Sequence, residues 1–155
     1  AADLIDVEAG LIDLALSAML HGDTDMVEEI LLPMANDGNV KAQLFMGIAF
    51  QQGNRAAEGI KWLQRAAEQG YGPGQKKLAS TYENGIGVPL DYVLAYKWYN
   101  LAAAWESSLA QNNNPSWQAR NYLAEKMPPE QIAEAQKLSR EWKAKPWKEV
   151  KQLIP

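Results

Sequence analysis

Two stretches of the chain align without a gap when one is shifted by 32 residues: ANDGNVKAQLFMGIAFQQG (residues 35–53) and AEQGYGPGQKKLASTYENG (residues 67–85). In this alignment small residues fall on small residues and aromatic residues on aromatic ones. Gly47 matches Ala79, and Phe50 matches Tyr82. Internal repetition at a fixed spacing is the sequence signature of a chain that stacks copies of one supersecondary unit.

The segment that follows each stretch repeats as well: GIKWLQRAA (residues 59–67) matches AYKWYNLAA (residues 95–103) at a shift of 36 residues. Trp62 then lies over Trp98, and the shift grows because a loop containing Ile86-Gly87-Val88-Pro89 adds four residues. Apolar and small residues recur at helical spacing within both units. Repeats of this length are typical of stacked helix–turn–helix hairpins, so the sequence predicts an all-α solenoid of about four antiparallel hairpins.

We expect eight helices and no strands. Their approximate ranges are 4–20, 24–36, 40–52, 56–69, 74–84, 91–110, 115–126 and 129–144. Residues 1–145 are expected to form a single domain and residues 146–155 a C-terminal tail. Among the tryptophans we expect Trp62, Trp98, Trp105 and Trp142 in the core, and Trp147 to pin the tail.

Composition excludes several classes of function. The 155 residues carry a net charge of -4, without the basic stripe that nucleic-acid binding needs. No apolar run approaches the roughly 20 residues of a membrane-spanning helix, so we expect no membrane insertion. The start Ala1-Ala2-Asp3 resembles what remains after signal-peptide cleavage, and on this hint we expect a periplasmic or secreted protein, the cytoplasm remaining an alternative.

The residues that usually carry chemistry are scarce. The chain has no cysteine and one histidine, His21, which leaves no thiolate or multi-histidine metal site. His21 follows an expected helix, where an imidazole commonly contacts the last carbonyl groups. No serine lies in a G-x-S-x-G elbow, and Gly85-Ile86-Gly87 lacks the lysine of a phosphate-binding loop. We therefore expect no catalytic activity, no cofactor and no metal.

The stretch Tyr82-Glu83-Asn84-Gly85-Ile86-Gly87-Val88-Pro89-Leu90-Asp91-Tyr92, followed by Ala95 and Trp98, resembles the Sel-1-like repeat family, relatives of the tetratricopeptide repeat. Repeat-like sequence covers roughly residues 24–106. The resemblance implies a right-handed, curved α-solenoid that serves as a scaffold or adaptor. It also implies a bacterial protein, and bacterial members of the family are often exported to the periplasm. No particular ligand is implied.

In stacked hairpins the first helix of each pair lines the concave side, which here means residues 40–52, 74–84 and 115–126. Side chains on these helices that point away from the core should contact a partner. Leu44 and Ile48 are apolar where a solvated face would be polar, so they either extend the core or form a sticky patch. The predicted partner-binding residues are Leu44, Ile48, Gln51, Lys76, Ser80, Glu83, Trp117 and Arg120.

The sequence thus favours an interaction module, a monomer or weak dimer, that holds a protein or peptide in its concave groove. The alternative is a periplasmic accessory protein, or an inhibitor or immunity protein, that contacts cell-wall glycan or a secreted enzyme. A third class, a hydrolase, gains no support from a chain without cysteine.

Overall fold

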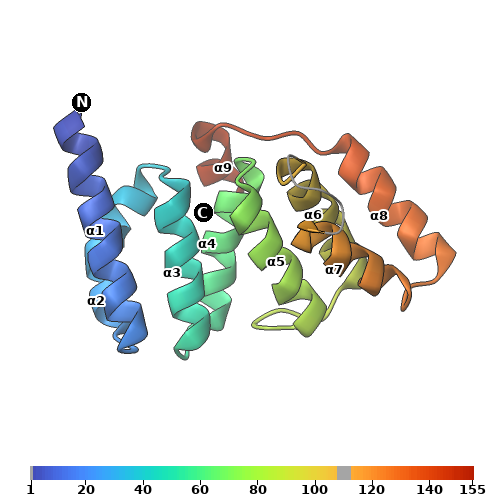
Figure 1. Cartoon of the computed structure of the whole chain (residues 1–155), viewed down its shortest axis with the longest axis horizontal. Helices are drawn as coiled ribbons and strands as arrows, with labels where there is room; N and C mark the ends of the chain where they lie inside the picture. The colour runs from blue at the N-terminus through green and yellow to red at the C-terminus, as the bar shows by residue number, and fades with distance from the viewer. Residues whose placement is uncertain (1, 108–112) are drawn as a thin grey trace.

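A computed structural model describes residues 2–107 and 113–155 of the chain. The regular secondary structure of the described residues is helical, without strands, and the helices stack along one axis as the repeats predict (Figure 1). The helices are α1 (Ala2–Leu20), α2 (Thr24–Asn36), α3 (Val40–Gln52), α4 (Ala56–Glu68), α5 (Gly72–Asn84), α6 (Tyr92–Trp105), α7 (Pro115–Ala124), α8 (Pro129–Glu141) and α9 (Trp147–Leu153).

The stack has two rows. Each helix from α1 to α6 packs on the next in sequence, and α3 also touches α1 and α5. Helices α1, α3 and α5 therefore form one row, and α2, α4 and α6 lie behind them (Figure 1). Beyond α6 the stacking changes, because α7 and α8 each pack on α6 rather than extensively on one another.

A buried hydrogen bond recurs at equivalent positions and confirms the register of the repeats. Gln43 Nε2 donates to the Ala35 carbonyl oxygen at 3.0 Å, and Gln75 Nε2 donates to the Ala67 carbonyl oxygen at 3.2 Å. Both glutamines are buried, so each bond satisfies a carbonyl that water cannot reach. One side chain thus ties each unit to the helix before it.

The core contains the two equivalent tryptophans, as the sequence predicts. Trp62 is 7% exposed and Trp98 is 4% exposed. Trp142 is half-buried and meets the Trp98 ring edge to face. The prediction for Trp105 is wrong, because its side chain is 55% exposed and covers Gly72 at the start of α5.

Helices α3 and α4 approach each other closely at a point where two glycines face each other. A Cβ atom on Gly59 would stand 2.7 Å from the Gly47 carbonyl oxygen. The equivalent residues of the next unit, Ala79 and Ala95, are fully buried. Small side chains at these positions let the paired helices approach closely.

The C-terminal segment turns back along the solenoid after α8 and ends in α9, a helix that the sequence does not predict (Figure 1). Trp147 packs on Gly38, whose φ of +94° favours glycine, and its Nε1 donates to the Asn36 carbonyl oxygen at 3.1 Å. Farther along, Arg65 Nε donates to the Ile154 carbonyl oxygen at 3.0 Å. Trp147 therefore pins this segment, as expected.

One other detail differs from the sequence prediction. Helix α6 ends at Trp105, short of the expected residue 110, and residues 108–110 of that range lie outside the described residues. No described helix is long and apolar enough to cross a membrane.

Candidate functional site

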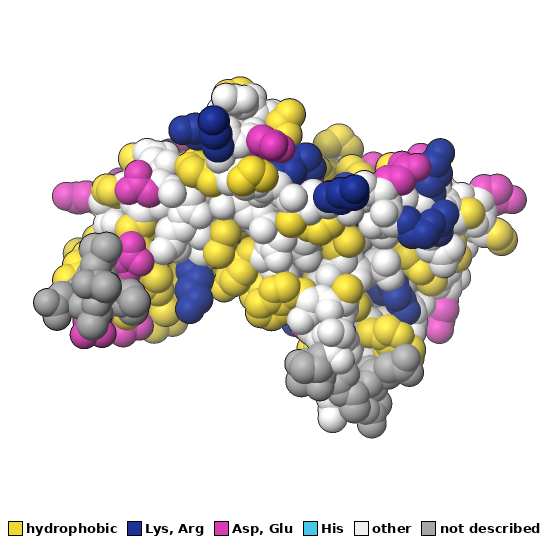
Figure 2. Space-filling view, turned by 90° about the horizontal axis from the view of Figure 1, so that it is seen from above, with side chains coloured by type: hydrophobic (Ala, Val, Ile, Leu, Met, Phe, Trp, Pro, Cys, Tyr) yellow, Lys and Arg dark blue, Asp and Glu magenta, His cyan; other side chains and the backbone are white. Residues whose placement is uncertain are grey.

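The row formed by α1, α3 and α5 is called the inner row, and the row formed by α2, α4 and α6 the outer row. A groove lies across the inner row. It has a volume of about 280 Å³ and is mostly apolar. Figure 2 shows hydrophobic side chains gathered along the hollowed lower edge of the molecule. The residues that line the groove come from four helices: Leu44 and Ile48 of α3, Pro73, Lys76, Lys77 and Ser80 of α5, Tyr99 of α6 and Ala119 of α7.

The repeat explains why these side chains meet. Leu44 and Ile48 are one helical turn apart, as are Lys76 and Ser80, so each pair lies on one helix face. At the shift of 32 residues, Leu44 is equivalent to Lys76 and Ile48 to Ser80. Stacking therefore places equivalent positions of two units side by side. The first unit contributes apolar groups and the second contributes polar ones.

The floor of the groove is closed by two nearly buried side chains. Leu44 is 7% exposed and Tyr99 is 5% exposed. Ile48, Lys76, Lys77 and Ser80 are half-buried and form the walls. Leu44 thus belongs to the core, whereas Ile48 offers surface to a ligand.

The phenol of Tyr99 is held in its protonated form. Burial raises its pKa, and so does the hydrogen bond that its hydroxyl donates to Glu83 Oε1 at 2.9 Å. A neutral phenol costs less to bury than a phenolate, so this floor suits an apolar ligand group.

Two of the predicted site residues form hydrogen bonds between neighbouring helices and do not line the groove. Gln51 Nε2 donates to Thr81 Oγ1 at 2.8 Å and thereby joins α3 to α5. Glu83 accepts the hydrogen bond from Tyr99 and joins α5 to α6. No sequence signal points to Tyr99 as a lining residue, because α6 belongs to the outer row.

Trp117 and Arg120 lie in a second groove, with a volume of about 490 Å³. Arg120 Nη1 donates to Asn100 Oδ1 at 2.6 Å, and its guanidinium group lies 6.0 Å from the centre of the Trp117 ring. The Asn114 side chain accepts a hydrogen bond from the Trp117 backbone and so caps the start of α7. The other described residues that line this groove are Ala103, Ala104 and Ser107.

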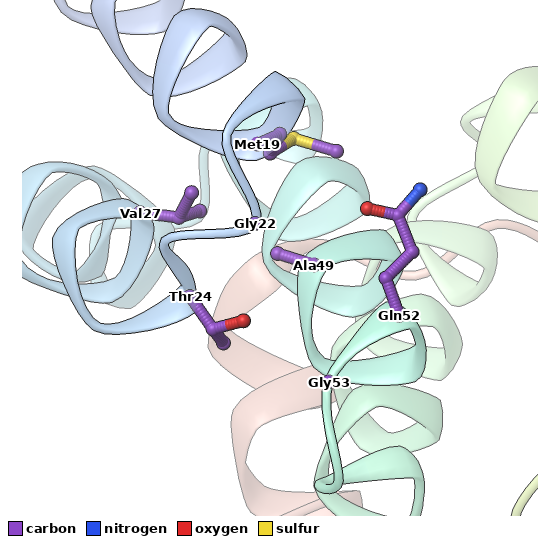
Figure 3. A pocket seen from close by; sticks show the side chains of 7 residues that line it. All are labelled: Met19, Gly22, Thr24, Val27, Ala49, Gln52 and Gly53. Atoms are coloured by element: carbon purple, nitrogen blue, oxygen red, sulfur yellow. The ribbon is translucent and has the colours of Figure 1, made fainter.

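A third cavity is too small to hold a metabolite. Figure 3 shows it between the turn that joins α1 to α2 and the end of α3, with Met19, Thr24 and Gln52 around it. Its volume is about 50 Å³, whereas ligand pockets measure roughly 300–1,000 Å³. Nearby, His21 Nδ1 lies 2.8 Å from the Ser17 carbonyl oxygen, which confirms its expected place at a helix end.

Among the described residues there is no group of three or more His, Asp or Glu side chains that could hold a metal ion. Their two larger inner grooves instead combine apolar surface with a few cations and amides. A two-row stack of helices with lined grooves on its inner face defines a helical-repeat solenoid.

The comparisons with known proteins make this class specific. A family model for the Sel1 repeat matches residues 40–71 and 72–104, which correspond to α3–α4 and α5–α6. Residues 40–104 thus consist of two Sel1 repeats, and such repeats generally mediate protein–protein interactions. No curated protein gave a match to this sequence.

One solved structure with the same architecture is a protective antigen present in uropathogenic Escherichia coli strains, which displays an SLR fold. The TM-score is 0.69 at 24% sequence identity. The match covers 95% of this chain and 33% of the antigen, so the chain spans about a third of that protein's length. The likeness establishes the fold.

Proposed function

We propose that the protein is a non-catalytic scaffold that holds a partner protein, through an extended peptide segment, in the inner groove of α3, α5, α6 and α7. The observation that carries this proposal is the groove itself. Four of the side chains that the sequence singles out lie together on it, namely Leu44, Ile48, Lys76 and Ser80. Its volume of about 280 Å³ accommodates side chains of a peptide better than a whole metabolite.

Exposed apolar surface in a hollow supports the same proposal. Ile48 is half-buried and lines the groove together with a proline and a buried tyrosine, so it offers contact area that stays dry once a partner side chain covers it. Binding energy at protein interfaces is concentrated in such central pockets. The expected partner therefore inserts one or two apolar side chains and leaves its polar groups at the rim.

A selection from random peptides displayed on phage tests the proposal. Peptides enriched on the immobilised chain are synthesised with a fluorescent label and titrated by anisotropy. We expect Ile48→Asp and the groove-filling Ser80→Phe to weaken binding at least about tenfold, because a hot-spot contact is worth 1.4 kcal/mol or more. Circular dichroism of both variants checks that they keep their helicity.

Leu153→Asp, at a 62% exposed position in α9, is the matched control and should bind normally. Peptides that bind Ile48→Asp and Ser80→Phe as tightly as the unaltered chain would place the binding surface elsewhere.

The second groove favours an alternative function, contact with cell-wall glycan by a protein exported to the periplasm. A half-buried tryptophan surrounded by Asn100, Asn114 and Arg120 offers a ring face and hydrogen-bonding groups to a polar ligand. Sedimentation with purified cell wall, lost in Trp117→Ala and retained in Ile48→Asp, would support this alternative. The reverse pattern, or no sedimentation, would exclude it.

A further inference from the structure

The two walls of the inner groove differ in charge. Leu44 and Ile48 make the α3 wall apolar, whereas the equivalent stretch of α5 carries Lys76 and Lys77. The net charge of the chain is -4, so this pair of cations runs against the overall balance. A ligand in the groove therefore meets hydrocarbon on one side and ammonium groups on the other.

Neither lysine has a carboxylate partner within residues 2–107 and 113–155. The ion pairs found there involve other cations: Arg55 with Glu28 and Glu58, Lys137 with Glu141, and Lys145 with Glu68. Glu83, the acidic residue two turns farther along α5, accepts the hydrogen bond from Tyr99. The charge of Lys76 and Lys77 is thus available to a bound molecule.

The position of the lysines along α5 gives the groove a direction. Lys76 and Lys77 follow the start of α5 at Gly72 by about one turn, near the positive end of the helix dipole. Glu83 lies near the other end of the same helix. A carboxylate of a ligand is therefore attracted to the first half of α5 and repelled from the second half.

We propose that the occupant of the groove is an extended peptide in which an Asp or Glu lies close in sequence to a large apolar residue. The apolar side chain enters the groove against Ile48 and Tyr99, and the carboxylate pairs with Lys76 and Lys77. In an extended chain, side chains two residues apart point to the same side and stand about 7 Å apart, so an acidic and an apolar side chain can both face the groove. This inference rests on the proposed function and adds the chemistry of the partner.

Other anionic ligands fit the groove less well. Nucleic acid binding relies on several phosphate contacts along a basic surface, and this groove offers two lysines on an acidic protein. Recruitment to anionic lipid likewise uses clusters of about four to eight basic residues. A single apolar cavity beside two cations matches a short acidic–apolar motif.

The test compares peptide selections on three forms of the full chain: the unaltered protein, the double variant Lys76→Glu with Lys77→Glu, and the control Lys148→Glu with Lys151→Glu. The control lysines are exposed residues of α9. We expect the unaltered chain and the control to enrich Asp or Glu within three residues of Leu, Ile, Met or Phe. The double variant should replace the acidic residue by Lys or Arg and keep the apolar one.

Titration of one synthetic acidic–apolar peptide gives the magnitude. We expect the double variant to bind it about 10- to 100-fold more weakly at low salt, and the gap to narrow in 0.5 M NaCl, because salt screens charges at the rim of an interface. The control variant should match the unaltered chain under both conditions.

The outcomes separate the two proposals. The enriched peptides could be apolar and lack an acidic residue, bind the double variant normally and fail to bind Ile48→Asp. This result would overturn the present inference and leave the scaffold function intact. Peptides indifferent to both sets of substitutions would overturn both proposals. A third outcome is that no peptide is enriched, while the unaltered chain binds an oligonucleotide or anionic phospholipid vesicles and the double variant does not. This result would assign the lysines to another class of ligand and overturn the inference.

Discussion

The glycine crossing between α3 and α4 gives the sharpest prediction about stability. In Gly59→Ala the new Cβ atom would stand 2.7 Å from the Gly47 carbonyl oxygen and 3.2 Å from the Phe50 Cβ atom, whereas ordinary contacts begin near 3.4 Å. The nearest obstacle is backbone, so the two helices must separate by several tenths of an ångström. Overpacking of this kind costs about 1–3 kcal/mol.

The intrinsic preference of the helix opposes this cost. Alanine is favoured over glycine in a helix by about 1 kcal/mol. We therefore expect Gly59→Ala to lower the free energy of unfolding by a net of up to about 2 kcal/mol, measured by urea denaturation followed by circular dichroism at 222 nm.

Gly10→Ala in α1 is the matched control, because nothing lies within 4 Å of its Cβ position. This substitution should stabilise the protein by about 0.5–1 kcal/mol, since only the helix preference acts. If Gly59→Ala were stabilising by the same amount, the close approach of α3 and α4 would not exist in solution, and the packing described for this repeat would be refuted.

Three further substitutions test other contacts. Gln43→Met should lower the free energy of unfolding by about 1–3 kcal/mol, and by more than Gln75→Met does. The reason is that Gln43 also accepts a hydrogen bond from the Gln69 side chain, whereas Gln75 Oε1 has no partner among the described residues. Equal urea midpoints for the two variants would contradict this. Tyr99→Phe should lower the free energy of unfolding by about 1–2 kcal/mol at neutral pH. Because the folded-state pKa of Tyr99 is raised, its contribution to stability is complete below its ordinary pKa near 10 and is lost as the pH rises toward the raised value. The variant should therefore lose less stability at alkaline pH, and parallel pH profiles of the two proteins would contradict the hydrogen bond to Glu83. Trp147→Ala should expose the segment around α9 to limited proteolysis while peptide binding at the inner groove stays unchanged, and unaltered resistance to protease would show that other contacts hold α9.

The stacking of helices can be predicted from the sequence because the same pattern of buried residues occurs in both repeat units. Equivalent residues have to meet equivalent neighbours in every unit, which is why Trp62 and Trp98 are both buried and why Gln43 and Gln75 make the same bond. The same equivalence brings Ile48 next to Ser80 on the inner groove.

The errors arise where the repeat ends. Trp105 shares a helix face with Trp98, but burial depends on what lies opposite. Among the described residues, the Trp105 ring contacts the start of α5 at Gly72 and Tyr71 and stays largely exposed. Trp105 also stands where the preceding unit has Gln69. A helical period alone cannot reveal what lies opposite a given helix face.

Helix α9 escapes prediction for a related reason. Its seven residues are too few to form a stable helix alone, and they are held by contacts with residues about a hundred positions earlier, such as the bond from Trp147 to the Asn36 carbonyl oxygen. The lining role of Tyr99 is likewise hidden, because it depends on an outer helix that reaches the groove between two inner ones.

The central claim is that partners bind the inner face of the stack. Methyl and amide NMR spectra recorded during titration with a selected peptide would test it most directly. We expect the largest shift changes on Ile48, Lys76, Ser80 and Tyr99, with little change in α2 and α9. Changes concentrated on α2, α4 or α9 would contradict it.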